Sequence, residues 1–348
     1  MELYSLCRSG VNLGGWISQY SEDNAGHYDS FVTEEDIKMI SEWGADHVRL
    51  PVDYHMVEDD EAPNKVREEG LAYIDACLEW CRKQGLNVVL DLHKAPGQVY
   101  GYDISPNPML IQEEYAGRFA AIWKNLALRY KTIRDSLIFE LLNEITDATG
   151  YLWNRLYPKV VEAIRREDPD RLIIAGSNDG NSVFALKELK LVDDARTIYN
   201  FHYYDPHMFT HQRAHFSSDM VAYDREILYP GEIPELVGFL DVHPEYRYRH
   251  ARYLWEKNDR QLMEKYLENA RDFIKYTGKQ LYCGEFGVIG TAPEEAALRW
   301  VADLVEILDA NRIGHCYWSY KEMDFGLVNL NREVVRPGLV TALFKALR

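Results

Sequence analysis

The sequence contains little cysteine, comparatively few basic residues and no long apolar segment, and each shortage excludes a class of protein. Its five cysteines are scattered and odd in number, which favours reduced structural thiols over a disulfide framework. No apolar run approaches the length of a membrane span. With 39 lysines and arginines against 56 acidic residues, the net charge is −17. That charge argues against nucleic acid or an anionic membrane surface as a partner and favours a soluble protein that acts on neutral molecules.

A secretory signal is also missing from this sequence. Residues 1–9 are too few and too polar to form one, and the first strand is predicted from about Gly10. Localisation is therefore left as two alternatives. Either the protein is cytoplasmic, which reduced thiols favour, or it is a secreted protein whose signal has been removed.

The most informative stretch is the apolar run at 136–144, which ends in Asn143 and Glu144. Such a run predicts a strand buried on both faces, and a carboxylate at its end needs a compensating role. The run at 280–287 repeats the pattern and contains Glu285. In one parallel barrel, both carboxylates would lie at the C-terminal rim, where barrel enzymes hold their active sites. Two carboxylates across a cleft are the minimum needed to cleave a glycosidic bond.

Predicted strands and helices alternate along the whole chain. The strands are predicted at about 10–16 (with its loop), 46–51, 87–93, 136–144, 171–175, 197–204, 280–287 and 314–320. The helices are predicted at about 33–43, 71–84, 113–130, 151–167, 259–276, 294–310 and 337–347. Eight regular units favour a closed (β/α)₈ TIM barrel over an open doubly wound sheet. We expect one catalytic domain, 1–348, with Pro51 ending the second strand.

One connection departs from this regularity. Residues 205–258 separate the sixth strand from its helix and are far longer than an ordinary strand-to-helix loop. Their aromatic and apolar content predicts a small folded insertion subdomain on the rim beside the cleft. We expect its aromatic side chains to form one wall of the cleft, namely Phe209, Phe216, Tyr223 and Tyr229.

Polar and aromatic residues follow six of the eight predicted strands. They are Arg49, His93, Asn143, Glu144, His202, Tyr204, Glu285 and Trp318. A single residue of this kind is commonly structural, and Glu144 alone would be as easily explained as half of a buried ion pair. So many at one rim are much harder to explain by packing and indicate an active site.

The order of these residues resembles glycoside hydrolase family 5, the cellulase family A. Family members carry Arg on strand two, Asp-Leu-His on strand three, Asn-Glu on strand four, His-x-Tyr on strand six, Gly-Glu-Phe-Gly on strand seven and Trp on strand eight. All eight characteristic positions have a match here, over essentially the whole chain. The segments 14–19, 201–206 and 282–287 are most similar to small single-domain endoglucanases of the CelC type, which also carry an insertion after strand six.

The resemblance implies a role for each residue. Glu144 would be the general acid/base and needs a raised pKa, whereas Glu285 would be the nucleophile. Arg49 and the Tyr204 hydroxyl would hold Glu285, and Asn143 would bond the sugar 2-hydroxyl. The remaining residues would bind sugar hydroxyls, orient the carboxylates or form the floor under the reacting ring: His93, His202 and Trp318. No cofactor or metal is implied.

The resulting expectation is a retaining endo-β-1,4-glucanase, a monomer acting on soluble β-1,4-glucans and mixed-linkage β-glucans. A β-mannanase or an exo-β-1,3-glucanase would use the same barrel. A non-catalytic glycan-binding barrel would keep the aromatics but would have no need of both glutamates. A metal-dependent barrel hydrolase would place its ligands at strand ends.

Other polar residues have weaker functional interpretations. His207, His211 and His215 have the spacing of ligands on one helix face, but surface or cleft histidines are favoured over a zinc site. Glu140 is expected in a structural pairing, and residues 58–61 in a solvated loop. Two residues past the last strand have two equal readings, sugar binding or a rim salt bridge: Lys321 and Asp324. Four aromatic residues in rim loops are possible stacking platforms or loop packing: Tyr20, Tyr100, Tyr102 and Phe325.

Overall fold

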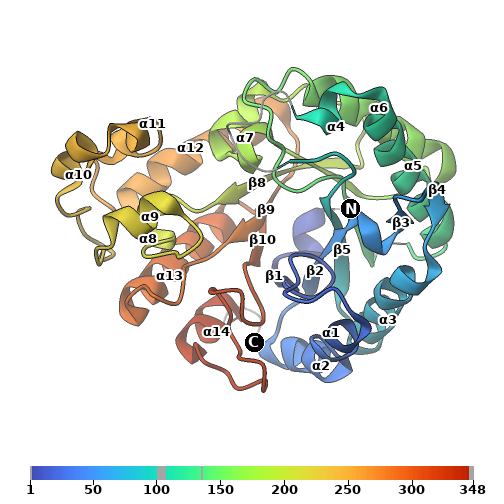
Figure 1. Ribbon diagram of the computed structural model, residues 1–348, viewed down its shortest axis with the longest axis horizontal. Coiled ribbons are helices and arrows are strands. Elements are labelled where there is room, and N and C mark those ends of the chain that lie inside the picture. Colours follow the sequence, from blue (N-terminus) through green and yellow to red (C-terminus); the bar gives the residue numbers. More distant parts are fainter. Residues whose placement is uncertain (1, 100–106, 135, 345–348) are drawn as a thin grey trace.

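The computed structural model of the chain describes residues 2–99, 107–134 and 136–344. Its centre is a closed barrel, which Figure 1 shows surrounded by helices. The strands follow one another around the barrel in the order β1-β10-β9-β8-β7-β6-β5-β2, and every neighbouring pair is parallel. They span Ser9–Asn12 (β1), His47–Asp53 (β2), Asn87–Lys94 (β5), Leu137–Glu140 (β6), Ile173–Gly176 (β7), Thr197–Tyr203 (β8), Leu281–Phe286 (β9) and Gly314–Tyr317 (β10). The predicted (β/α)₈ barrel is confirmed.

Amphipathic helices cover the outside of the barrel. They span Glu34–Trp43 (α2), Glu68–Gln84 (α3), Glu113–Tyr130 (α5), Trp153–Glu167 (α6), Arg260–Thr277 (α12), Glu294–Ala310 (α13) and Pro337–Phe344 (α14). Between β7 and β8 the connection is instead a 3₁₀-helix, Val183–Glu188. Shorter helices span Ala25–Ser30 (α1), Pro108–Ile111 (α4) and Asn178–Asn181 (α7). At the start of α2, Asp36 accepts the Thr33 backbone N–H at 2.8 Å as part of a capping box, which fixes the first turn of the helix.

The interior of the barrel changes from apolar to polar along the strands. Successive strand side chains point to opposite sides, so Ile138 and Glu140 of β6 share the inner face. Ile138 belongs to a small apolar cluster with Val89 of β5 and Ile198 of β8. One layer higher, Glu140 and Arg49 of β2 form a buried ion pair. The C-terminal rim therefore rests on a layer of buried charge.

One local expectation is wrong, and a second holds only in part. Strand β2 runs through Pro51 to Asp53 rather than ending at the proline. Its pairing with β1 ends at Arg49, and the Asp53 N–H points to the β1 side, so Pro51 lacks its N–H where no strand neighbour needs it. Residues 58–61 form the expected solvated loop only in part. Asp60 and Glu61 are the exposed turn of a hairpin, in which β3 (Glu58–Asp59) pairs with β4 (Ala62–Val66). Glu58 is buried there and accepts from Arg118 at 2.5 Å.

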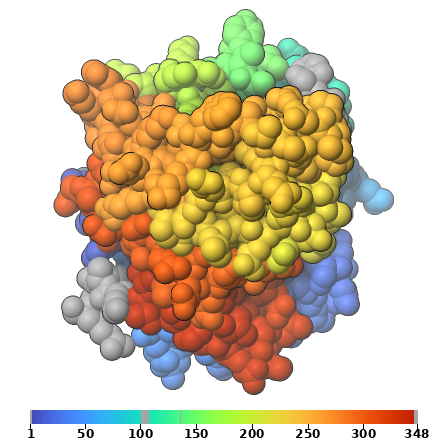
Figure 2. All heavy atoms as spheres, turned by 90° about the vertical axis from the view of Figure 1, so that its left-hand side faces the viewer, coloured from blue at the N-terminus to red at the C-terminus, as the bar shows by residue number. Residues whose placement is uncertain are grey.

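The insertion at 205–258 is folded and packs on the barrel beside α12 and α13 (Figure 1). It contains α8 (His207–Thr210), α9 (Ser218–Tyr223), α10 (Leu236–Val242) and α11 (Arg247–His250). The ring of Phe209 lies 6.4 Å from that of Trp300 on α13, and the Tyr229 hydroxyl donates to Asp303 at 2.7 Å. Figure 2 shows its yellow and light orange atoms in one continuous surface with the orange and red atoms that follow.

The structure also shows the state of the cysteines and the hydropathy of the helices. All five cysteines are buried and free, as the scattered spacing predicts. Within the described ranges, no helix has both the length and the hydropathy to cross a membrane.

Candidate active site

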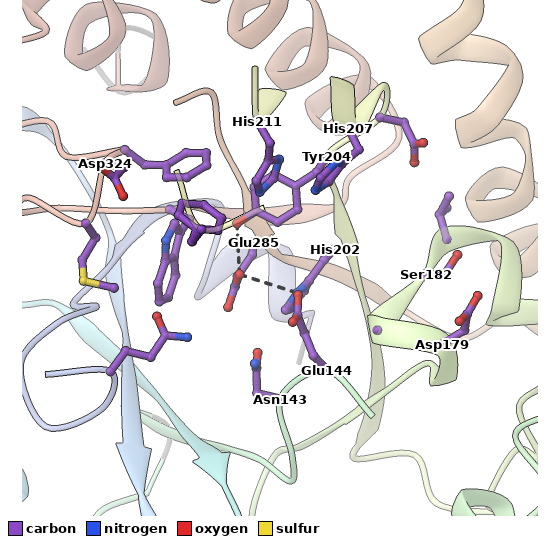
Figure 3. A pocket seen from close by; sticks show the side chains of 18 of the residues that line it. Asn143, Glu144, Asp179, Ser182, His202, Tyr204, His207, His211, Glu285 and Asp324 are labelled. Atoms are coloured by element: carbon purple, nitrogen blue, oxygen red, sulfur yellow. Dashed lines mark hydrogen bonds and ion pairs between the residues drawn. The ribbon is translucent and has the colours of Figure 1, made fainter. Parts of the chain in front are cut away.

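Glu144 and Glu285 face each other at the C-terminal rim of the barrel. Glu285 belongs to β9, and Glu144 follows the end of β6. One carboxylate oxygen of each glutamate and a ring nitrogen of His202 all lie within 4.8 Å of one another. Figure 3 shows the three side chains directed into one cleft. Carboxyl groups are separated by about 5–5.5 Å in retaining glycosidases and by about 6.5–9.5 Å in inverting ones, so the approach of these oxygens favours the retaining range.

Two donors hold the Glu285 carboxylate. Arg49 donates through Nη1 to Oε1 at 2.7 Å, and the Tyr204 hydroxyl donates to Oε2 at 3.0 Å. Arg49 is fully buried, so its charge is not screened by water and its hydrogen bond is charge-assisted. These contacts fix both oxygens of Glu285 and stabilise their negative charge.

Arg49 is itself held by a second carboxylate below the rim. Its Nε and Nη2 donate to the two oxygens of Glu140 at 2.7 and 2.9 Å, and Nη2 lies 3.0 Å from Asp91 Oδ2. Burial raises the pKa of Glu140, an effect that the Arg49 charge opposes. The expected structural pairing of Glu140 is thus present, and its bidentate contact orients the guanidinium toward Glu285.

The surroundings of Glu144 differ from those of Glu285. Burial raises the pKa of Glu144, although its side chain keeps 37% exposure toward the open cleft. Its backbone has a positive φ of 39°, a strained conformation for a residue other than glycine. His202 Nδ1 lies 3.2 Å from Glu144 Oε1, and burial lowers the pKa of His202 to about 4. Asn181 donates to His202 Nε2 at 3.2 Å, so the neutral ring carries its proton on Nδ1 and donates it to Glu144.

The floor of the cleft is formed by Asn143, His93 and Trp318. The side-chain Oδ1 of Asn143 accepts from Arg49 at 3.0 Å, while its Nδ2 lies 3.3 Å from His93 Nε2. His93 Nδ1 donates to Asp91 at 2.7 Å, so Nε2 is left as the acceptor. The His93 and Trp318 rings stack at 5.6 Å and 12°. All eight residues predicted at strand ends therefore meet at one site.

The cleft holds a volume of about 640 Å³ and extends to either side of the two glutamates. Beyond the strand-end residues, it is lined by Gln19, Asp179, Ser182, Phe216, Arg252, Asp324 and others. Gln19 donates to His93 at 2.8 Å. Asp179 and Ser182 were not predicted, because the strand before them ends in no motif. The polar sequence Ser-Asn-Asp-Gly-Asn at 177–181 is the one signal that could have drawn attention to them.

The expected aromatic wall is mostly wrong. Phe209, Tyr223 and Tyr229 are instead buried in the core of the insertion. The rings of Phe209 and Tyr229 contact each other, and the ring of Tyr223 contacts Phe239. Phe216 alone lines the cleft, with 56% of its surface exposed. The rest of that wall is polar.

The three spaced histidines do not converge. His207 and His211 stack with centroids 4.1 Å apart and line the cleft, whereas His215 is exposed and lies 3.1 Å from Asp324. Helix α8 ends at Thr210, so the assumed helical spacing does not hold. Among the described residues, the one group with metal-ligand spacing is the Glu144, His202 and Glu285 set already named. The interpretation of His207 and His211 as cleft residues is the one the geometry supports.

The remaining rim residues fall into two groups, those with a structural role and those that line the cleft. Lys321 is buried in an ion pair with Asp36 at 2.8 Å, a structural role, while Asp324 lines the cleft. Phe325 is buried with one side on the cleft, and Tyr20 is partly buried beside Tyr28. Tyr100 and Tyr102 lie outside the described residues.

The chain is similar to known proteins over nearly its whole length, both in sequence and in fold. The family described as Cellulase (glycosyl hydrolase family 5) matches residues 10–324. Endoglucanase C of Acetivibrio thermocellus is 42% identical over 340 residues, 97% of each chain. Cellodextrinase A of Ruminococcus flavefaciens is 36% identical over 84% of this chain and 79% of its own length. The solved structure of endoglucanase Cel5A from Thermotoga maritima has a TM-score of 0.77 at 24% identity, over 99% of this chain and 100% of that one, a likeness of fold.

Proposed function

The chain belongs to glycosyl hydrolase family 5, and from the geometry of its two glutamates we propose that it hydrolyses internal β-1,4 bonds of β-glucans with retention of configuration. The observation that carries the proposal is the close approach of Glu144 and Glu285, with oxygens within 4.8 Å and different neighbours around each. That difference is what a nucleophile and a proton donor require.

In the first step, a carboxylate oxygen of Glu285 attacks the anomeric carbon and forms a covalent glycosyl ester. Glu144 donates its proton to the glycosidic oxygen, so the shortened chain leaves as an alcohol. Burial keeps Glu144 protonated to higher pH than an exposed glutamate, which suits a donor. Arg49 and Tyr204 hold Glu285 in position for attack.

In the second step, Glu144 accepts a proton from water, and the resulting hydroxide oxygen displaces Glu285 from the sugar. Asn143 presents an amide N–H to the 2-hydroxyl of the reacting sugar, a contact that strengthens in the transition state. Its orientation is fixed by Arg49 on one side and His93 on the other. Trp318, stacked on His93, supplies the flat surface beneath the ring.

Endo action on β-1,4-glucan is supported by the relatives and by the shape of the cleft. The relative at 42% identity over nearly both full chains is an endoglucanase. The cleft continues past the glutamates toward Asp324 in one direction and Asp179 in the other (Figure 3). A site with room on both sides accepts the middle of a chain.

The test is to follow viscosity and reducing ends together on carboxymethyl cellulose and on mixed-linkage β-glucan. Internal cuts lower viscosity well before reducing ends accumulate, and this is the expected result. Early release of a single sugar or disaccharide at unchanged viscosity would show exo action. Activity confined to mannan or β-1,3-glucan would contradict the proposed linkage.

A further inference from the structure

A second cavity of about 330 Å³ adjoins the catalytic cleft on the side of the insertion. It is lined by Asp179, His207, Tyr248, Arg249, His250 and Arg252. Three of these also line the cleft, namely Asp179, His207 and Arg252, so the two spaces share a wall. Its size lies within the range of about 300–1,000 Å³ that is typical of small-molecule sites.

The order of strands around the barrel places this cavity on the leaving-group side. Glu285 is on β9 and Glu144 follows β6, so the line between them divides the rim into two arcs. Trp318 follows β10 and belongs to the arc of β10, β1, β2 and β5, which carries the floor for the reacting sugar. Asp179 follows β7 and His207 follows β8, on the opposite arc. A glucan chain that spans the two glutamates would therefore place the sugars of its leaving group toward the second cavity.

Asp179 is a carboxylate with unused hydrogen-bonding capacity. In the described part of the chain, it has no hydrogen-bond or ion-pair partner, although burial and the nearby Glu188 raise its pKa. Its backbone is left-handed, with φ 54° and ψ 52°, as is that of the next two residues. A strained segment that aims a polar group without a partner into a cleft is typical of a binding function.

The opposite wall supplies a donor and an aromatic surface. Arg252 is fixed by Asp205 at 2.7 Å and lies over the ring of Tyr253 at 4.9 Å, so its guanidinium is held at the junction of the two cavities. Tyr248 on α11 lines this cavity and is 71% exposed, so its aromatic ring is accessible to a ligand there. An aromatic face beside charged hydrogen-bonding groups is a common surface for a sugar ring.

The charges favour a neutral ligand over an anion. Arg252 is paired with Asp205, and Arg249 lies 3.5 Å from Asp219. Asp179 adds a negative charge at the entrance. The cavity therefore has no excess positive charge with which to attract a phosphate or a uronic acid.

We propose that this cavity is a distal subsite for the leaving end of the glucan chain, in which Asp179 and Arg252 bond sugar hydroxyls and Tyr248 stacks on a sugar ring. The proposal rests on the proposed function, since it assigns the substrate class of the same site. Binding energy gained there positions the bond to be cleaved and raises turnover of long substrates.

The test compares cellohexaose, which extends into the subsite, with 4-nitrophenyl β-cellobioside, whose leaving group ends one ring past the cleaved bond. Asp179→Gly removes the carboxylate and keeps the left-handed backbone, Asp179→Asn keeps partial hydrogen bonding, and Tyr248→Ala removes the aromatic face. Tyr276→Ala is the matched control, because Tyr276 is 75% exposed on α12 and lines neither cavity. The readout is the ratio of kcat/KM for cellohexaose to kcat/KM for the aryl cellobioside.

We expect this ratio to fall about tenfold in Asp179→Gly, less in Asp179→Asn, and roughly threefold to tenfold in Tyr248→Ala. Tyr276→Ala should leave it unchanged. An unchanged ratio in both Asp179→Gly and Tyr248→Ala would overturn the subsite while leaving the proposed function intact. A wild-type enzyme that cleaves neither substrate would instead overturn the proposed function.

Discussion

At the scale of single residues, the environment of Glu144 determines how activity should depend on pH. Burial raises its pKa, so the protonated donor persists to higher pH and is lost as the pH rises through that pKa. Turnover of natural glucans should therefore fall on the alkaline side. Glu144→Gln should remove this limb from the pH profile, because no titrating donor remains.

The same variant separates the acid from the nucleophile. Glu144→Gln should reduce turnover of cellohexaose by about 10²–10⁴-fold, the usual contribution of a general acid. An aryl glycoside with an activated leaving group needs little protonation and should lose far less. Steady-state kinetics on both substrates provide the measurement. Equal losses on the two substrates, with the alkaline limb retained, would show that Glu144 is not the acid.

The strand-end residues could be predicted from the sequence because alternation along parallel strands fixes which side chains reach the rim. Glu144, Glu285 and their partners follow directly from that rule. Asp179 could not be predicted, since it lies on an irregular segment whose course depends on tertiary contacts. For the same reason, the sequence could not show that Phe216 alone among the four insertion aromatics reaches the cleft. Cleft walls built by loops carry no periodic signal.

At the scale of elements, the insertion packs against helix α13 of the barrel through buried aromatic residues. Phe209 is fully buried between Tyr229 of the insertion and Trp300 of α13. Phe209→Ala should lower the free energy of unfolding by about 3–5 kcal/mol, since it leaves a cavity at this junction. Phe216→Ala, in the same insertion but 56% exposed, is the control and should change stability little.

Denaturant unfolding followed by tryptophan fluorescence and by far-UV circular dichroism would measure both changes. Coincident single transitions are expected for the wild type and for Phe209→Ala, because insertion and barrel are predicted to be one domain. Two separated transitions, with Phe209→Ala shifting only the first, would show that the insertion unfolds on its own.

Element boundaries were predictable where local signals were strong. Helices α5 and α13 have the expected bounds, since each begins with a pair of glutamates and has a clear apolar stripe. The end of β2 cannot be predicted from Pro51, because the sequence does not show that the pairing of β2 with β1 already ends at Arg49. The β3–β4 hairpin was missed because Glu58 is buried by an ion pair with a distant arginine, Arg118.

At the scale of the whole molecule, eight parallel strands bring residues from positions 19 to 325 into one cleft. The recurring strand-helix pattern was sufficient to predict this closure, because right-handed crossovers leave few alternatives. The overall charge of −17 is compatible with the neutral substrate that we propose. The central claim is that the barrel cleaves β-glucan through a covalent intermediate on Glu285.

Trapping that intermediate tests the claim most directly. A 2-deoxy-2-fluoro-β-cellobioside with an activated leaving group should react once and then turn over slowly, because fluorine destabilises the oxocarbenium-like transition state of both steps. Mass spectrometry of the intact and digested protein should find one fluorocellobiosyl group per chain, on the peptide that contains Glu285, and none in Glu285→Gln. Rapid turnover or inactivation with no adduct, or an adduct on Glu144 or Glu140 instead, would contradict the account.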